Sequence, residues 1–125
     1  MKHLVDVNVL LAAIWSQHPQ HTLTFDWLAG KEIVLCPLAE LGFVRISTHK
    51  KAFNFPMDKT RELLATFTTE RQATRIADDL PVLESRPEKS EQVTDHYLAD
   101  LAAKHGLKFA TLDTGIKHDA VDLIR

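Results

Sequence analysis

Four acidic residues stand in apolar stretches of this sequence. They are Asp6, Glu40, Asp95 and Asp113. A carboxylate beside buried surface costs free energy unless it is paired or bound to a cation, and like charges brought together raise one another's pKa. If the four converge, they form an all-oxygen site that favours Mg²⁺ or Mn²⁺ over Zn²⁺. Such a site suits phosphoryl chemistry, in which a metal activates water for an in-line displacement.

Asp6 and Asp113 share a context, because each follows a run typical of a buried strand, Leu4-Val5 and Phe109–Leu112. If both strands are central and parallel, their carboxylates emerge at the same edge of the sheet, where open α/β proteins bind ligands. The alternative interpretation is that each aspartate caps the turn or helix that follows it.

Glu40 and Asp95 fall on the apolar sides of two predicted helices. Apolar residues follow Glu40 at three and four positions, and Asp95 shares a side with Leu98 and Ala99. Asp100 points roughly 140° away from Asp95 and is expected to be solvated. The alternatives are a rim glutamate with a packed stem and a first-turn aspartate favoured by the helix dipole.

The elements that must position these acids alternate between strand and helix. Strands are predicted at residues 4–5, 32–35, 75–77, 107–112 and 121–124, and helices at 7–15, 22–30, 37–48, 58–67 and 95–105. Pro37 suits the first turn of a helix, Asp58 and Thr94 suit helix caps, and Gly30 and Gly106 suit helix ends. The alternation predicts an α/β three-layer sandwich around a central parallel sheet. No repeat or linker is visible, so residues 1–125 are expected to form one domain.

The composition excludes several classes. The chain has 125 residues, of which 45% are hydrophobic and 26% charged, with a formal net charge of −2, so global disorder and simple phosphate coating are both disfavoured. Cys36 is the only cysteine, which rules out an internal disulfide and a Cys-rich zinc site, and its apolar flank predicts a core position. No apolar run approaches the roughly 18 residues of a membrane span, and no signal peptide is apparent. We therefore expect a cytoplasmic protein without a membrane partner.

A basic cluster is the best candidate for phosphate contacts. It consists of Arg45, His49, Lys50 and Lys51. Cations beside a metal site would hold a nucleic-acid backbone, although a solvated loop explains the cluster equally well.

Four segments, taken in order, resemble a known family. They are Leu4–Leu10, Cys36–Arg45, Val93–Ala99 and Thr111–Asp113, and together they span nearly the whole chain. In order and spacing they are similar to the PIN-domain ribonucleases, and most closely to the VapC-type toxins of bacterial toxin–antitoxin pairs. The resemblance implies a PIN-like fold with an acidic Mg²⁺ or Mn²⁺ pocket that activates water for RNA cleavage.

By position, the resemblance assigns the catalytic role to all four acids and the metal to Asp6, Asp95 and Asp113. Asn8 and Thr111 would support the site by hydrogen bonding, since both residue types can orient a carboxylate. The resemblance further implies a small antitoxin partner, a homodimer, and a structured RNA substrate such as tRNA or rRNA.

The chain departs from the family pattern after Asp113. Many relatives continue with a polar pair and an aromatic residue, whereas this chain continues with Thr114–His118. Two other classes fit less well. A phospho-receiver needs an acidic pair at the first turn and a lysine ending a late strand, but Lys108 begins its strand; a haloacid-dehalogenase-like phosphatase needs an aspartate where Asn8 stands. A catalytically inactive PIN-like binding domain remains an open alternative.

Overall fold

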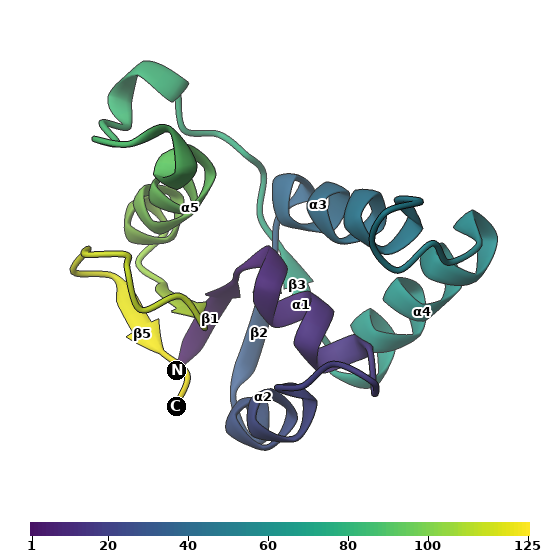
Figure 1. Cartoon of the computed structure of the whole chain (residues 1–125). Coiled ribbons are helices and arrows are strands. Elements are labelled where there is room, and N and C mark those ends of the chain that lie inside the picture. Colours follow the sequence, from purple (N-terminus) through teal and green to yellow (C-terminus); the bar gives the residue numbers. More distant parts are fainter.

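Five short strands pair side by side in one sheet, and all of them run in parallel (Figure 1). They are β1 (Lys2–Val5), β2 (Glu32–Leu35), β3 (Thr74–Arg75), β4 (Lys108–Thr111) and β5 (Val121–Leu123). The computed structural model describes residues 1–125. The strands in the middle of the sheet, β1, β2 and β4, each have three consecutive buried residues, as expected of strands covered on both faces. The parallel sheet flanked by helices confirms the predicted α/β class.

The strand order, β3-β2-β1-β4-β5, reverses direction at β1. The chain first builds outward from β1 to β2 and β3, and then returns to place β4 on the other side of β1, with Leu4 paired to both Val34 and Phe109. In open parallel sheets the loops diverge at such a point and leave a crevice outside the carboxyl ends of the strands. That crevice lies beyond β1 and β4, the two strands that precede Asp6 and Asp113.

Five α-helices connect and cover the strands (Figure 1). They are α1 (Val7–Ile14), α2 (His21–Leu28), α3 (Pro37–Thr48), α4 (Met57–Glu70) and α5 (Val93–Lys104), with two short 3₁₀ turns, η1 (Val82–Glu84) and η2 (Ser90–Gln92). Pro37 occupies the first turn of α3, and Gly30 and Gly106 follow the ends of α2 and α5 with positive φ of 78° and 70°. These three predictions are confirmed. None of the helices combines the length and apolar character needed to cross a bilayer.

Two predicted helix caps are wrong, because both helices begin earlier. The N-cap of α4 is Pro56 and that of α5 is Gln92, so Asp58 and Thr94 lie inside the first turns. The Asp58 carboxylate accepts a bond from the neighbouring Lys59 N–H at 3.0 Å. The α5 helix continues directly from η2, so a turn rather than a capping side chain precedes it.

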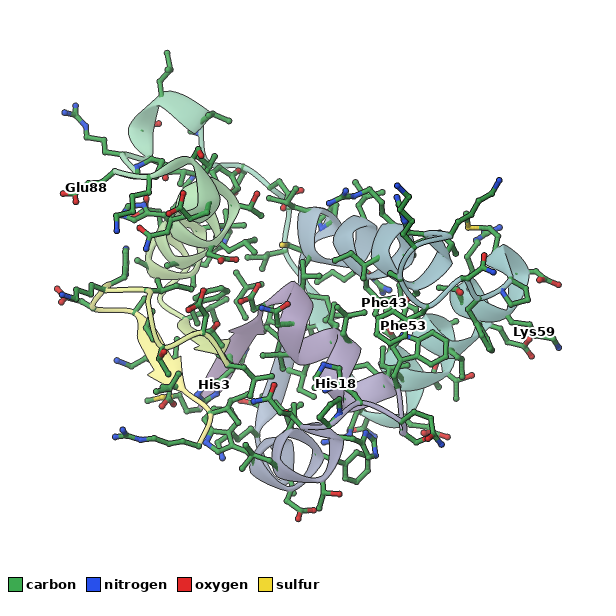
Figure 2. All side chains as sticks on the ribbon, in the orientation of Figure 1. His3, His18, Phe43, Phe53, Lys59 and Glu88 are labelled. Atoms are coloured by element: carbon green, nitrogen blue, oxygen red, sulfur yellow. The ribbon has the colours of Figure 1, made fainter.

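The core draws on both the sheet and the helices, and 25 buried apolar residues form one cluster. Phe43 of α3 is fully buried and stacks on Trp15, which also stacks on Phe53; Figure 2 shows the two phenylalanines close together beside α1. Cys36 is fully buried, as predicted, and burial raises the pKa of its thiol to about 12. This thiol is therefore an inert core group.

A close contact joins the first turn of α1 to the second turn of α3. A Cβ atom added to Gly42 would lie 2.6 Å from Val7 Cγ2, which is closer than atoms can pack. Glycine at this position therefore allows α3 to approach α1. Both helices follow neighbouring parallel strands, β1 and β2, so they start at the same edge of the sheet, and this contact packs them closely there.

Candidate metal centre

Asp6 is a buried carboxylate held at both oxygens. It follows β1 and its residue exposure is only 1%. One oxygen, Oδ1, accepts a bond from Val7 N–H at 2.7 Å, so Asp6 does cap α1. The other oxygen, Oδ2, accepts a bond from Thr111 Oγ1 at 2.8 Å. The carboxylate is thus both a helix cap and a fixed group facing β4.

Thr111, the last residue of β4, links two of the acids. Its hydroxyl donates to Asp6 and also accepts a bond from the backbone N–H of Asp113 at 3.1 Å. The Asp113 carboxylate in turn accepts a bond from Gly115 N–H at 2.8 Å, which makes a local aspartate turn. One buried hydroxyl therefore sets the relative positions of the chain segments that carry Asp6 and Asp113.

The third acid, Asp95, interacts electrostatically with both of the others. Burial, and then the charge of Asp95, raise the pKa of Asp6 to about 7, despite the hydrogen bonds from Thr111 and Val7 that favour its ionised form. Burial and the charge of Asp113 likewise raise the pKa of Asp95. The charge of each acid therefore acts on the next one, from Asp6 after β1, through Asp95 in the first turn of α5, to Asp113 after β4.

Glu40 stands in the first turn of α3 and is held by a partner that the sequence did not indicate. Arg75 of β3 donates hydrogen bonds to its carboxylate from Nη2 at 2.8 Å and from Nε at 3.1 Å. The Glu40 side chain is 16% exposed and that of Arg75 is 51% exposed. Hydrogen bonding to Glu40 raises the pKa of Arg75. The pair fixes the position of the Glu40 carboxylate, but no contact joins Glu40 to the other three acids.

The remaining predicted site residues lie on the surface of the protein. Asn8 is exposed on the first turn of α1. The residues Arg45, His49, Lys50 and Lys51 are all exposed. At 1.5 Å of rise per residue, His49 lies about 14 Å along α3 from Glu40, so His49, Lys50 and Lys51 are at the other end of the helix from that acid.

The three acids lack a cationic partner from the protein. No lysine, arginine or histidine forms an ion pair with Asp6, Asp95 or Asp113. As placed, no three acidic, histidine or cysteine side chains are close enough to hold a metal ion. The donors nevertheless fit a hard divalent cation, because they are carboxylate oxygens only and a cation would offset the charge of the buried Asp6.

An open parallel sheet with uncompensated acids at its switch point defines an α/β domain with an acidic ligand site. The PIN domain family matches residues 3–121 of the chain. The chain is 32% identical to ribonuclease VapC38 of Mycobacterium tuberculosis over 90% of its own length and 86% of that protein. It is also 33% identical to ribonuclease VapC44 of the same species, over 97% of this chain and 92% of that protein.

Two solved structures share the fold of this chain. The chain superposes on a structure of VapBC2 from Rickettsia felis bound to a DNA fragment from their promoter, with a TM-score of 0.67, 17% identity, and coverage of 98% of this chain and 97% of that one. A structure of FitAB bound to an IR36 DNA fragment gives a TM-score of 0.59 at 20% identity, covering 92% and 87%. The chain therefore belongs to the PIN-domain family, as a VapC-type member, which confirms the resemblance seen in the sequence.

Proposed function

We propose that this protein is a divalent-metal-dependent endoribonuclease that acts as the toxin of a type II toxin–antitoxin pair. The observation that carries the proposal is the buried Asp6 carboxylate beside Asp95 at the switch point of the sheet. Family membership and relatives named as ribonucleases support it. We also propose that residues 1–125 act as one nuclease domain.

In this proposal Asp6, Asp95 and Asp113 hold Mg²⁺ or Mn²⁺. When bound, such a cation supplies an activated water and stabilises the leaving oxygen of the phosphodiester. Thr111 fixes the Asp6 carboxylate for this task, and the exposed Asn8 of the next turn supports the site from its rim. The net reaction adds water across one P–O bond, leaving a phosphate end and a hydroxyl end.

Glu40 completes the proposed catalytic set as the group that accepts the proton of the attacking water. Arg75 forms an ion pair with this carboxylate at 2.8 Å, and a positioned carboxylate can take up a proton from a reacting group. The pair also fixes the direction of the carboxylate, since the guanidinium contacts it through two nitrogens.

We further infer a cognate antitoxin, a second copy of the chain and structured cellular RNA such as tRNA or rRNA as partners, all in the cytoplasm. An exposed apolar patch supports a protein partner, because Val82, Leu83 and Val93 are 70%, 91% and 46% exposed. Apolar side chains gathered on a surface favour association with another protein.

The test is cleavage of total cellular RNA by the purified protein with Mn²⁺, with Mg²⁺ and with excess EDTA. We expect cleavage with either metal, none with EDTA, and loss of cleavage in Asp6→Asn. The matched control is Asp26→Asn, which makes the same chemical change at an exposed position of α2. EDTA-resistant cleavage, or full activity in folded Asp6→Asn, contradicts the site. Failure of the folded wild type to cleave any RNA favours the inactive binding domain.

A further inference from the structure

A polar pocket of about 320 Å³ adjoins the acidic centre between the start of α5 and the loop from β4 to β5. Arg86, Lys89 and Lys117 line it, together with Gln92 and His96 of η2 and α5. Only one of its eight lining residues is hydrophobic. Its chemistry therefore suits a charged, hydrogen-bonding ligand rather than an apolar one.

The wall of this pocket is hydrogen-bonded to the acidic centre. The Gln92 side-chain amide donates to the backbone carbonyl of Gly115 at 3.3 Å. The N–H of the same Gly115 donates to the Asp113 carboxylate at 2.8 Å. On α5, Asp95 lies between Gln92 and His96 in sequence, so the helix presents the acid and the pocket on adjacent sides. A ligand in the pocket is therefore a close neighbour of whatever binds at the acids.

The pocket concentrates positive charge in a chain that is negative overall. Three cationic side chains line it against one carboxylate, Glu88, whereas the whole chain carries a formal net charge of −2. Arg86, Lys89 and Lys117 are exposed, and none of them forms an ion pair within the protein. Figure 2 shows Glu88 at the outer edge of its segment. The three cations are thus free to bind an external anion.

Two anchors hold the loop that carries Lys117. On one side of it, Ile116 is 9% exposed and belongs to the core cluster. On the other side, His118 Nε2 lies 2.7 Å from Asp100 Oδ1, and His96 Nδ1 lies 3.0 Å from Asp100 Oδ2. The sequence predicts a solvated Asp100, but its side chain is only 23% exposed because two histidines lie against it. A backbone fixed in this way reduces the entropy lost when a ligand binds Lys117.

We propose that Arg86, Lys89 and Lys117 bind the backbone phosphates of an RNA strand beside the bond that is cut. This inference rests on the proposed function, since it assigns the RNA path at the same site. When one phosphodiester of an RNA strand lies at the acids, the neighbouring phosphates lie beside them. The three cations line a pocket whose wall includes Gly115, and Gly115 is hydrogen-bonded to Asp113. None of the basic residues Arg45, His49, Lys50 and Lys51 lines this pocket.

The test measures binding of a fluorescein-labelled oligouridylate to Asp6→Asn protein by fluorescence anisotropy, over a range of salt concentrations with Mg²⁺ present. For single strands, each phosphate contact contributes about −0.7 to the slope of log K against log salt, so each contact that is removed makes the slope about 0.7 shallower. We therefore expect Lys89→Ala/Lys117→Ala in this background to bind more weakly, with a slope reduced by about 1.4. Adding Arg86→Ala reduces the slope further.

The matched control is Lys2→Ala/Lys59→Ala, which removes the same two charges at exposed positions. Lys2 is the first residue of β1, at the opposite end of the strand from Asp6, and Lys59 of α4 lies across the molecule from Glu88 (Figure 2). We expect the control to retain the parent slope. Equal unfolding midpoints in urea for both doubles show that neither change disturbs the fold.

An unchanged slope in the pocket variant overturns the inference, as does Asp6→Asn protein that binds no oligouridylate. Binding of an oligoglutamate peptide, but not of RNA, through the same lysines assigns the pocket to an acidic protein partner and overturns it as well. The measurement does not require cleavage. A shallower slope therefore supports RNA binding in the pocket even if the wild type does not cleave RNA. Cleavage by the wild type together with an unchanged slope contradicts RNA binding in the pocket but leaves the proposed nuclease activity intact.

Discussion

The buried Asp6 carboxylate predicts an unusual dependence of stability on pH in the metal-free protein. Its pKa is about 7 in the folded state, raised by burial and by Asp95 from 3.8. A carboxyl group that holds its proton more tightly when folded stabilises the fold while protonated and loses that advantage on ionisation. Stability from this group is therefore full below pH 4 and falls as the pH rises toward 7. Three pKa units at 1.36 kcal/mol each amount to about 4 kcal/mol.

The substitution Asp6→Asn removes this titration, because the amide resembles the protonated carboxyl group. We expect the free energy of unfolding of the wild type to fall by up to about 4 kcal/mol between pH 4 and pH 7.5 relative to that of Asp6→Asn. The measurement is urea unfolding of both proteins in EDTA across that range, with Asp26→Asn as the exposed control. Subtracting the curves cancels the groups that titrate alike in both.

Divalent cations should act in the opposite direction. At pH 7.5 Mn²⁺ is expected to stabilise the wild type, because it binds the folded carboxylates and not the unfolded chain, and the gain grows with the ratio of free metal to Kd. Asp6→Asn should gain much less. Parallel pH profiles for the wild type and Asp6→Asn in EDTA would refute the assignment of a raised pKa to this carboxyl group.

Two further substitutions probe the same framework. Thr111→Val keeps the shape of the side chain but removes the hydroxyl that donates to Asp6 and accepts from Asp113 N–H, so we expect the free energy of unfolding in urea to fall by about 1–3 kcal/mol. Thr111→Ser should restore most of this loss. An unchanged unfolding midpoint in Thr111→Val contradicts the structural role of the hydroxyl. Gly42→Ala forces a Cβ against Val7, so we expect a loss of about 1–3 kcal/mol by the same measurement, whereas equal stability would show that α1 and α3 can move apart freely.

The sequence was most informative where local patterns decide the structure. Asp6 and Asp113 follow apolar strands, and the helical phase of α5 separates Asp95 from Asp100, so the positions of three acids follow from periodicity. The parallel sheet follows from the alternation of strands and helices. These features depend on residues within a few positions of one another.

Features that depend on distant residues were missed. The bond between Glu40 and Arg75 joins residues 35 positions apart, and it exists because β3 pairs with β2. Asp100 is covered by His118, which comes from a loop 18 positions away. Local periodicity carries no information about such pairings, since they depend on strand order and on where the loops fold back.

The centre is assembled from segments that the ribosome makes at very different times. Asp6 is synthesised 105 residues before Thr111, and β1 acquires β4 as a neighbour only after both strands are made. A partly synthesised chain therefore holds Asp6 without the hydroxyl that fixes it. If the protein cuts RNA as proposed, its own messenger and ribosome are exposed to a complete centre only after the last of these segments has been made.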